Sequence, residues 1–136
     1  MIWISKAIFW IVAAFYAYGA LVHVMNMAGM SGFNWAQAPL KWQVLDVVYL
    51  ILDVIVALGL VLAWRIGLVA FFAAAISQIV LYTVLRSWIV DVPEAFARTP
   101  EEIGYLDGLV VFHVATIILI IAAIWIGNAA SASPTT

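Results

Sequence analysis

Four polar side chains interrupt long apolar stretches of this chain: His23, Asp53, Gln78 and His113. An ionisable group at the centre of a membrane span costs about 2.5–3.5 kcal/mol on insertion scales, so each such group needs a partner or a function. At a rise of 1.5 Å per residue, the predicted helices place all four roughly 6–15 Å below one membrane face. We therefore expect a single polar layer to which four helices contribute.

Helical spacing gives these residues polar neighbours on the same helix face. Asp46, Tyr49 and Asp53 follow one another at i, i+3 and i+7, and Tyr82 follows Gln78 at i+4. Residues at such spacings lie on one face of a helix. The sequence therefore predicts polar stripes that meet inside a bundle.

Asp53 is the only acid that falls deep inside an apolar stretch. Asp46 and Asp107 are expected nearer to the membrane interface, within reach of water. A buried carboxyl group needs a hydrogen-bond partner, and Gln78 or His113 is the predicted partner of Asp53.

These residues are compatible with several chemistries. In the first, the layer is structural, and its hydrogen bonds hold four helices in register. In the second, His23 and His113 ligate a b-type haem, since axial imidazoles from two helices are a common haem arrangement. In the third, Asp53, Gln78 and Tyr82 form a quinone or proton site.

A fourth chemistry is copper binding near the end of the first apolar stretch. His23, Met25, Met27 and Met30 place one imidazole and three thioethers within eight residues. Such soft ligands suit Cu(I). Methionine also fills irregular gaps at the ends of apolar helices, so the structural alternative stays open.

The composition indicates a membrane protein. Of the 136 residues, 68% are hydrophobic and 9% are charged, whereas soluble domains carry about 25% charged residues. The formal net charge of −2 provides no basic patch for nucleic acid, which is excluded as a partner. The chain contains no cysteine, which excludes disulfides, thiolate metal sites and iron–sulfur clusters.

Four segments are long and apolar enough to cross a bilayer, which takes about 20 residues. They predict an all-α fold: one integral membrane domain over 1–127, an antiparallel four-helix bundle with two longer loops on one face. A disordered tail is expected over 128–136. The predicted spans are about 4–27, 40–64, 66–87 and 105–127.

Helix-start signals lie in the second long loop. Asp91 and Thr99 each precede a glutamate by three residues, which is the spacing of a capping box. They predict a short interfacial helix over 91–98 and a fourth long helix that begins at Pro100.

Short apolar motifs mark the middle of the chain: Leu40-Lys41-Trp42-Gln43, Leu52-Asp53, Leu58-Gly59-Leu60, Trp64-Arg65-Ile66-Gly67 and Ser77-Gln78. Through these motifs the chain resembles the DoxX-like small four-helix membrane proteins of bacteria. The resemblance spans about 40–82 and continues weakly through Phe112 and His113. It implies a bundle in the bacterial inner membrane, and some relatives look like small subunits of quinone-linked oxidoreductases.

The sequence predicts a small subunit or assembly partner of a larger membrane complex of redox or respiratory type, without catalysis of its own. A haem b- or quinone-binding redox subunit is the first alternative, and a proton-coupled or copper-handling transporter is the second. The expected partners are the lipid bilayer and other membrane subunits, or further copies of the chain. Lys6 and Arg65 favour termini in the cytoplasm of a bacterium, because basic residues beside short segments stay inside.

Overall fold

The computed structural model describes residues 3–132, with side chains up to Ala129. Four long helices dominate this part of the chain: α1 (Trp3–Met27), α2 (Leu40–Val61), α3 (Arg65–Tyr82) and α5 (Pro100–Ala132). A short helix, α4 (Arg86–Val90), and two 3₁₀ turns, η1 (Trp35–Gln37) and η2 (Glu94–Phe96), complete the elements. The fold is all-helical, as predicted.

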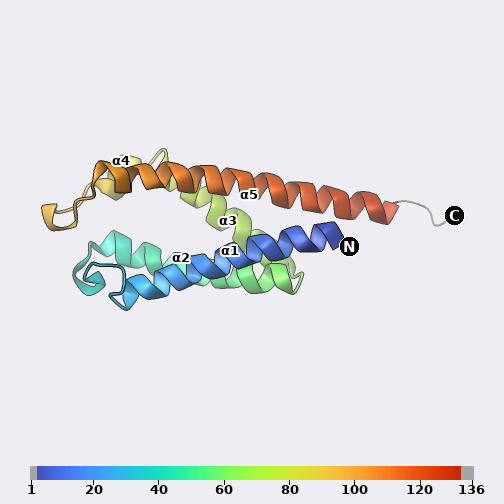
Figure 1. Cartoon of the computed structure of the whole chain (residues 1–136), viewed down its shortest axis with the longest axis horizontal. Coiled ribbons are helices and arrows are strands. Elements are labelled where there is room, and N and C mark those ends of the chain that lie inside the picture. Colours follow the sequence, from blue (N-terminus) through green and yellow to red (C-terminus); the bar gives the residue numbers. More distant parts are fainter. Residues whose placement is uncertain (1–2, 133–136) are drawn as a thin grey trace.

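Successive long helices run antiparallel, so both termini lie at one end of the bundle and the two long loops at the other (Figure 1). We call these the terminal end and the loop end. Helix α1 packs against α2 and α5, and α3 packs against the same two helices. The four helices therefore form a ring in which α1 faces α3 across the core.

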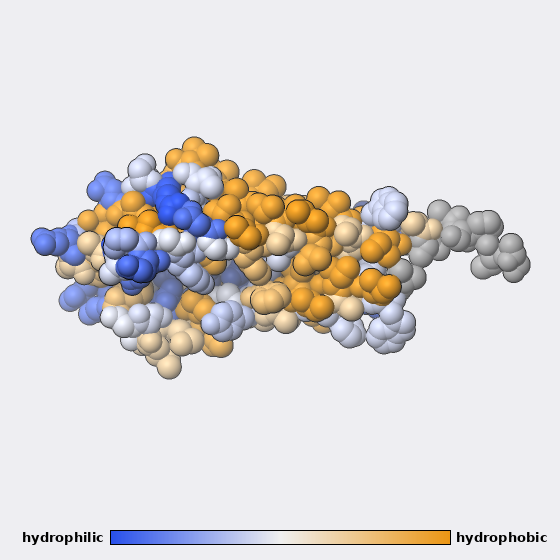
Figure 2. All heavy atoms as spheres, turned by 45° about the horizontal axis from the view of Figure 1, so that its top comes forward, coloured by the Kyte–Doolittle hydropathy of each residue, from blue (hydrophilic) through white to orange (hydrophobic). Residues whose placement is uncertain are grey.

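All four long helices have the length and hydropathy of membrane spans. Large apolar side chains such as Trp3, Val69 and Ile118 are exposed around the bundle, which in water would be unfavourable. Figure 2 shows hydrophilic residues gathered at the loop end of the visible face and hydrophobic residues over the remainder. This surface fits a multi-pass protein in a lipid bilayer.

The core fills the terminal half of the bundle. Val12, Val56, Phe71 and Ile120, one from each long helix, are fully buried. Ser5 is buried beside them and donates a hydrogen bond to the carbonyl of Ala123 at 2.8 Å. The terminal half is therefore closely packed, which leaves the loop half to hold a site.

Helix ends differ from the predicted ones where local hydrogen bonds intervene. Helix α2 ends at Val61, because Ala63 adopts a left-handed conformation (φ 56°) and Trp64 N–H donates to the Gly59 carbonyl at 2.8 Å. These are features of a Schellman-type ending. Helix α3 stops at Tyr82 rather than near residue 87.

A threonine marks the end of α3. The Thr83 hydroxyl donates to the Ile79 carbonyl at 2.6 Å, a bond that competes with regular helix geometry. The short helix of this region is then α4 at Arg86–Val90, and 91–98 holds only η2. The expected interfacial helix over 91–98 is thus replaced by a helix one segment earlier.

Helix α5 begins where the sequence predicts but continues beyond its predicted end. Glu102 accepts a hydrogen bond from Thr99 N–H at 2.9 Å, and Glu102 N–H donates to the Thr99 hydroxyl at 3.3 Å, so the predicted capping box is confirmed. A disordered tail was expected from Asn128, but α5 continues to Ala132. The remainder of that predicted tail, 133–136, lies outside the described residues.

Candidate functional site

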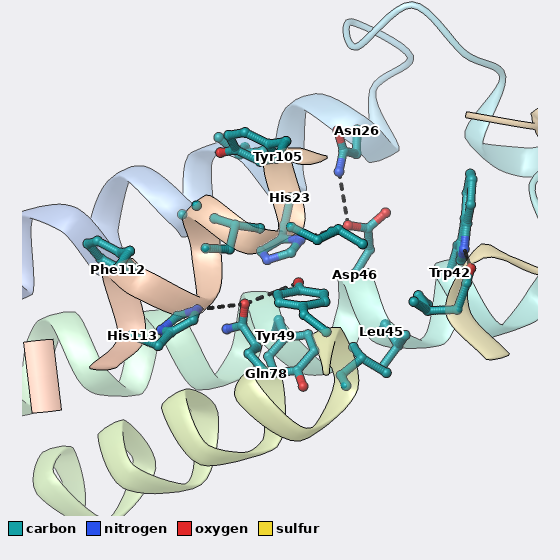
Figure 3. A pocket seen from close by; sticks show the side chains of 18 of the residues that line it. His23, Asn26, Trp42, Leu45, Asp46, Tyr49, Gln78, Tyr105, Phe112 and His113 are labelled. Atoms are coloured by element: carbon teal, nitrogen blue, oxygen red, sulfur yellow. Dashed lines mark hydrogen bonds and ion pairs between the residues drawn. The ribbon is translucent and has the colours of Figure 1, made fainter. Parts of the chain in front are cut away.

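The loop half of the bundle encloses a cavity of about 880 Å³. His23, Asp53, Gln78 and His113, the four polar residues singled out in the sequence, all line it. Figure 3 shows the side chains of His23, Gln78 and His113 around this space, together with aromatic side chains from α2 and α5. The structure therefore brings the four into one site rather than spreading them along the bundle.

Asp46 organises the loop-end wall of the cavity. Its Oδ1 lies 2.7 Å from His23 Nδ1 and accepts a bond from Asn26 Nδ2 at 3.0 Å. Its Oδ2 accepts a bond from the Trp35 indole at 2.8 Å. Three donors from α1 and η1 thus satisfy one carboxylate on α2, and Asp46 is only 8% exposed. The prediction that Asp46 reaches water is wrong, because the loop that carries Trp35 folds over it.

Asp53 follows Asp46 by about two helical turns on the same face of α2, so it lies deeper in the bundle. It is 4% exposed. Its Oδ2 is 3.8 Å from His23 Nε2, so it faces His23 rather than the predicted Gln78 or His113. Its Oδ1 is buried and has no hydrogen-bond partner among the described residues. A buried polar atom without a partner costs about 1–3 kcal/mol, so this oxygen requires an explanation.

A glycine on α1 makes room for Asp53. A Cβ atom at Gly19 would lie 2.5 Å from Asp53 Oδ2, which is far inside van der Waals contact. Gly19 lies between Tyr16 and His23 on one face of α1, and its lack of a side chain admits the carboxyl group of the neighbouring helix.

The second polar group of the site joins α3 to α5. Gln78 Oε1 lies 3.0 Å from His113 Nε2 and accepts a bond from the Tyr82 hydroxyl at 3.2 Å. The Tyr16 hydroxyl lies 3.4 Å from His113 Nδ1, and Thr116 donates to the His113 carbonyl. Both described bonds of Gln78 use its oxygen, so its amide nitrogen remains a donor.

Aromatic side chains form most of the remaining wall. Tyr49 stacks on His23 with ring centroids 6.3 Å apart, and its hydroxyl donates to Ser77 at 3.0 Å. Phe112 packs edge-on against Phe15 at 5.5 Å. An apolar cavity with few convergent polar groups is the usual form of a small-molecule site.

The rim at the loop end is held by cations. Arg98 lies over the rings of Trp42 and Phe33, at 5.0 and 5.4 Å from their centroids, and pairs with Glu102 at 3.0 Å. Lys41 donates to the carbonyl of Trp88 at 2.5 Å. These contacts fix the two loops beside the mouth of the cavity.

Arg86 ties α4 to the first turns of α5. It donates to both oxygens of Asp107 and to the Ile103 carbonyl. The hydrogen bonds that Arg86 donates to Asp107 raise the pKa of Arg86, so this cation stays charged. As expected, Asp107 is exposed and reaches water.

The histidines are poorly placed to ligate haem as they stand. His23 has Asp46 at one ring nitrogen and Asp53 near the other, and His113 has Tyr16 and Gln78 at its two nitrogens. An axial bond would require His113 to give up one of its two partners, whereas His23 Nε2 lies 3.8 Å from Asp53 Oδ2, beyond hydrogen-bond distance. At His113 the arrangement thus favours hydrogen bonding over axial ligation.

Of the four proposed copper ligands, His23 alone lines the cavity. Met25 follows His23 by two residues on α1, which at 100° per residue places it on the far side of the helix. Met30 lies beyond the helix end and is 69% exposed. None of the three methionines is among the residues that line the cavity, and the described residues contain no cluster of three His, Cys, Asp or Glu that could hold a metal.

Sequence reasoning missed Trp35 and underestimated Asp46 and Tyr16. The repeat of Asp46, Tyr49 and Asp53 on one helix face was a signal for Asp46, and the same reasoning applies to Tyr16 on α1. No helical pattern could reveal Trp35, because it reaches Asp46 from a loop.

Comparison of the chain with protein-family models, curated proteins and solved structures finds no match. The resemblance to DoxX-like proteins therefore stays a prediction.

Proposed function

We propose that this chain is a small membrane subunit whose loop-end cavity binds a quinone-class head group. The observation that carries the proposal is the buried Asp53 Oδ1, which lines the cavity without a partner. A purely structural layer would satisfy its buried groups from within. A ligand that offers a hydroxyl group would instead donate to this oxygen.

A quinone head matches the site in shape and in hydrogen bonding. Its flat ring suits walls built from aromatic side chains such as Tyr49 and Phe112. Its carbonyl oxygens are acceptors, which the Gln78 amide nitrogen serves as a donor. In the reduced form its hydroxyl groups are donors, and the Asp53 carboxylate accepts them.

The bound head group would lie between two separate hydrogen-bonded clusters. His23 and Asp46 support Asp53 on one side, and His113 and Tyr82 orient Gln78 on the other. Such support fixes the side chains that meet the ligand, which lowers the cost of ordering them on binding.

The wider setting that we propose is a larger redox complex in a bacterial inner membrane, with the termini in the cytoplasm. The chain has little mass outside its spans, so a partner subunit would supply the electron-transfer centre. Lys6 and Arg65 at the terminal end support this orientation.

The test is equilibrium binding of a tritiated benzoquinone with a decyl tail to purified protein in nanodiscs. We expect saturable binding by the parent and a loss of affinity of about tenfold or more, about 1.4 kcal/mol, in Asp53→Leu. Asp91→Leu makes the same exchange at an exposed acid outside the cavity and should bind like the parent. Parent-like affinity in Asp53→Leu would overturn the proposal.

Asp53→Asn provides a second comparison if the leucine variant does not fold. Asparagine keeps the shape of aspartate but loses the charge, and hydrogen bonds to a charged acceptor are roughly twice as strong as neutral ones. This variant should therefore lose more affinity for the quinol form than for the quinone form. Equal affinities of parent and variant for the quinol would contradict the role of Asp53.

Haem b remains the rival ligand, and a visible absorption spectrum of the same preparation decides between them. We expect no Soret band, because both ring nitrogens of His113, one of the two axial ligands that the haem would need, face protein partners. A Soret band that disappears in both His23→Gln and His113→Gln would replace quinone with haem.

A further inference from the structure

Helices α1 and α5 are joined only over part of their length. Phe15 and Tyr16 of α1 meet Phe112 and His113 of α5, and towards the terminal end Ser5 bonds Ala123. Among the described residues, no hydrogen bond or ring contact joins the two helices on the loop side of Phe112. Figure 1 shows the same divergence, with α1 and α5 near each other at the terminal end and apart at the loop end.

The gap left by this divergence opens into the cavity. Tyr18 on α1 and Tyr105 on α5 both line the cavity, yet they are 65% and 66% exposed. Gly108 lines it too, and a Cβ atom at that position would have no other atom within 4 Å. The cavity therefore reaches the outer surface of the bundle between these helices.

This opening lies at membrane depth. Tyr18 precedes the end of α1 at Met27 by nine residues, which is about 13 Å at 1.5 Å per residue. Its surroundings on the outer face are apolar, with Leu21 on α1 and Val111 on α5 both more than half exposed. The surface around the opening would thus face lipid chains rather than water.

We propose that the gap between α1 and α5 is a lateral portal through which the apolar tail of a lipid-soluble ligand extends into the bilayer. This inference rests on the proposed function and deepens it, because it assigns the ligand to the long-tailed quinones. The head group would lie against Asp53 and Gln78, and the tail would pass Gly108. Gly108 leaves the portal wide because it has no side chain.

The experiment compares two benzoquinones with the same ring, one with a decyl tail and one with a methyl group in its place. Each is bound to parent, Gly108→Phe and Gly104→Phe in neutral-lipid nanodiscs. Gly104 lies one turn earlier on α5, also has open space at its Cβ position, and does not line the cavity. It is therefore a matched control for bulk and helix propensity.

We expect Gly108→Phe to weaken the tailed ligand by about tenfold and to leave the affinity of the tail-less ring unchanged, while Gly104→Phe alters neither. Equal binding of the tailed ligand by Gly108→Phe and parent would overturn the portal. Equal losses for both ligands would also overturn it, because the side chain would then obstruct the head-group site. Failure of the parent to bind either ring would instead refute the proposed function.

Discussion

The two acids on the inner face of α2 differ in how completely they are satisfied. Asp46 has three hydrogen-bonded partners, whereas Asp53 has one imidazole at 3.8 Å and one oxygen with no partner. Both are buried, so exposure does not distinguish them. We interpret Asp46 as the residue that positions His23, and Asp53 as the residue that meets the ligand.

The position of Asp53 in the site depends on Gly19, because glycine has no side chain to occupy the same space. Gly19→Ala would place a methyl group 2.5 Å from the present position of Asp53 Oδ2, so the carboxyl group must turn away from α1. We expect the protein to fold, since alanine favours helix, and to lose about tenfold in affinity for the decyl benzoquinone. Circular dichroism and equilibrium binding measure the two effects.

Gly104→Ala is the matched control, because its new methyl group meets open space. It should fold and bind like the parent. If Gly19→Ala also kept full affinity, the position of the Asp53 carboxyl group would not matter for binding.

Helical periodicity was enough to identify most polar residues of the site. A spacing of three and four residues places Asp46, Tyr49 and Asp53 on one face, and one face of a helix in a bundle is buried. The pairing of these residues could not be predicted in this way. Asp53 meets His23 rather than Gln78 because Gly19 admits it against α1, and that depends on how two helices pack.

At the scale of elements, Gly59 on α2 and Gly67 on α3 let the backbones of these two helices approach closely. A Cβ atom at Gly59 would lie 2.4 Å from Gly67 Cα, and one at Gly67 would lie 2.6 Å from Gly59 Cα. Small residues at such crossings are what membrane packing favours.

Gly59→Ala should therefore destabilise the bundle. The methyl group would meet backbone, which cannot rotate away, and overpacking of this kind costs about 1–3 kcal/mol. The measurement is the thermal unfolding midpoint in detergent, which should fall relative to the parent. Gly104→Ala should keep or raise the midpoint, and an unchanged midpoint in Gly59→Ala would mean that the two helices are free to separate.

The ends of the elements were harder to predict than their existence. Hydropathy marks where a segment is apolar, but α3 ends at Tyr82 while the apolar stretch continues. The ending depends on the Thr83 hydroxyl and on Arg86, which bonds Ile103 and Asp107 of α5. Contacts between distant segments of this kind leave no periodic signal.

For the whole molecule, four spans predict that both termini and the α2–α3 turn share one side of the membrane. Reporter enzymes or fluorescent proteins fused after Asn128 and after Arg65 should give the same sidedness, and a fusion at Pro93 should give the opposite one. Opposite results at Asn128 and Arg65 would require an odd number of crossings between them and would contradict the four-helix topology.

The two halves of the bundle differ, because the terminal half is closely packed and the loop half holds the large cavity. Close packing around Phe71 and Ile120 holds the four helices together, and the divergence of α1 and α5 leaves the larger space towards the loops. A smaller cavity of about 150 Å³ lies at the other end, between Phe9 and Leu68. We therefore require the ligand to occupy the loop half of the bundle.

Photolabelling with an azido-benzoquinone, followed by peptide mass spectrometry, tests that requirement most directly. We predict adducts on cavity residues of α2 and α5, such as Tyr49 and Phe112, that disappear with an excess of unlabelled decyl benzoquinone. Adducts around Phe9 and Leu68, or adducts on lipid-facing residues that the excess does not reduce, would contradict the account.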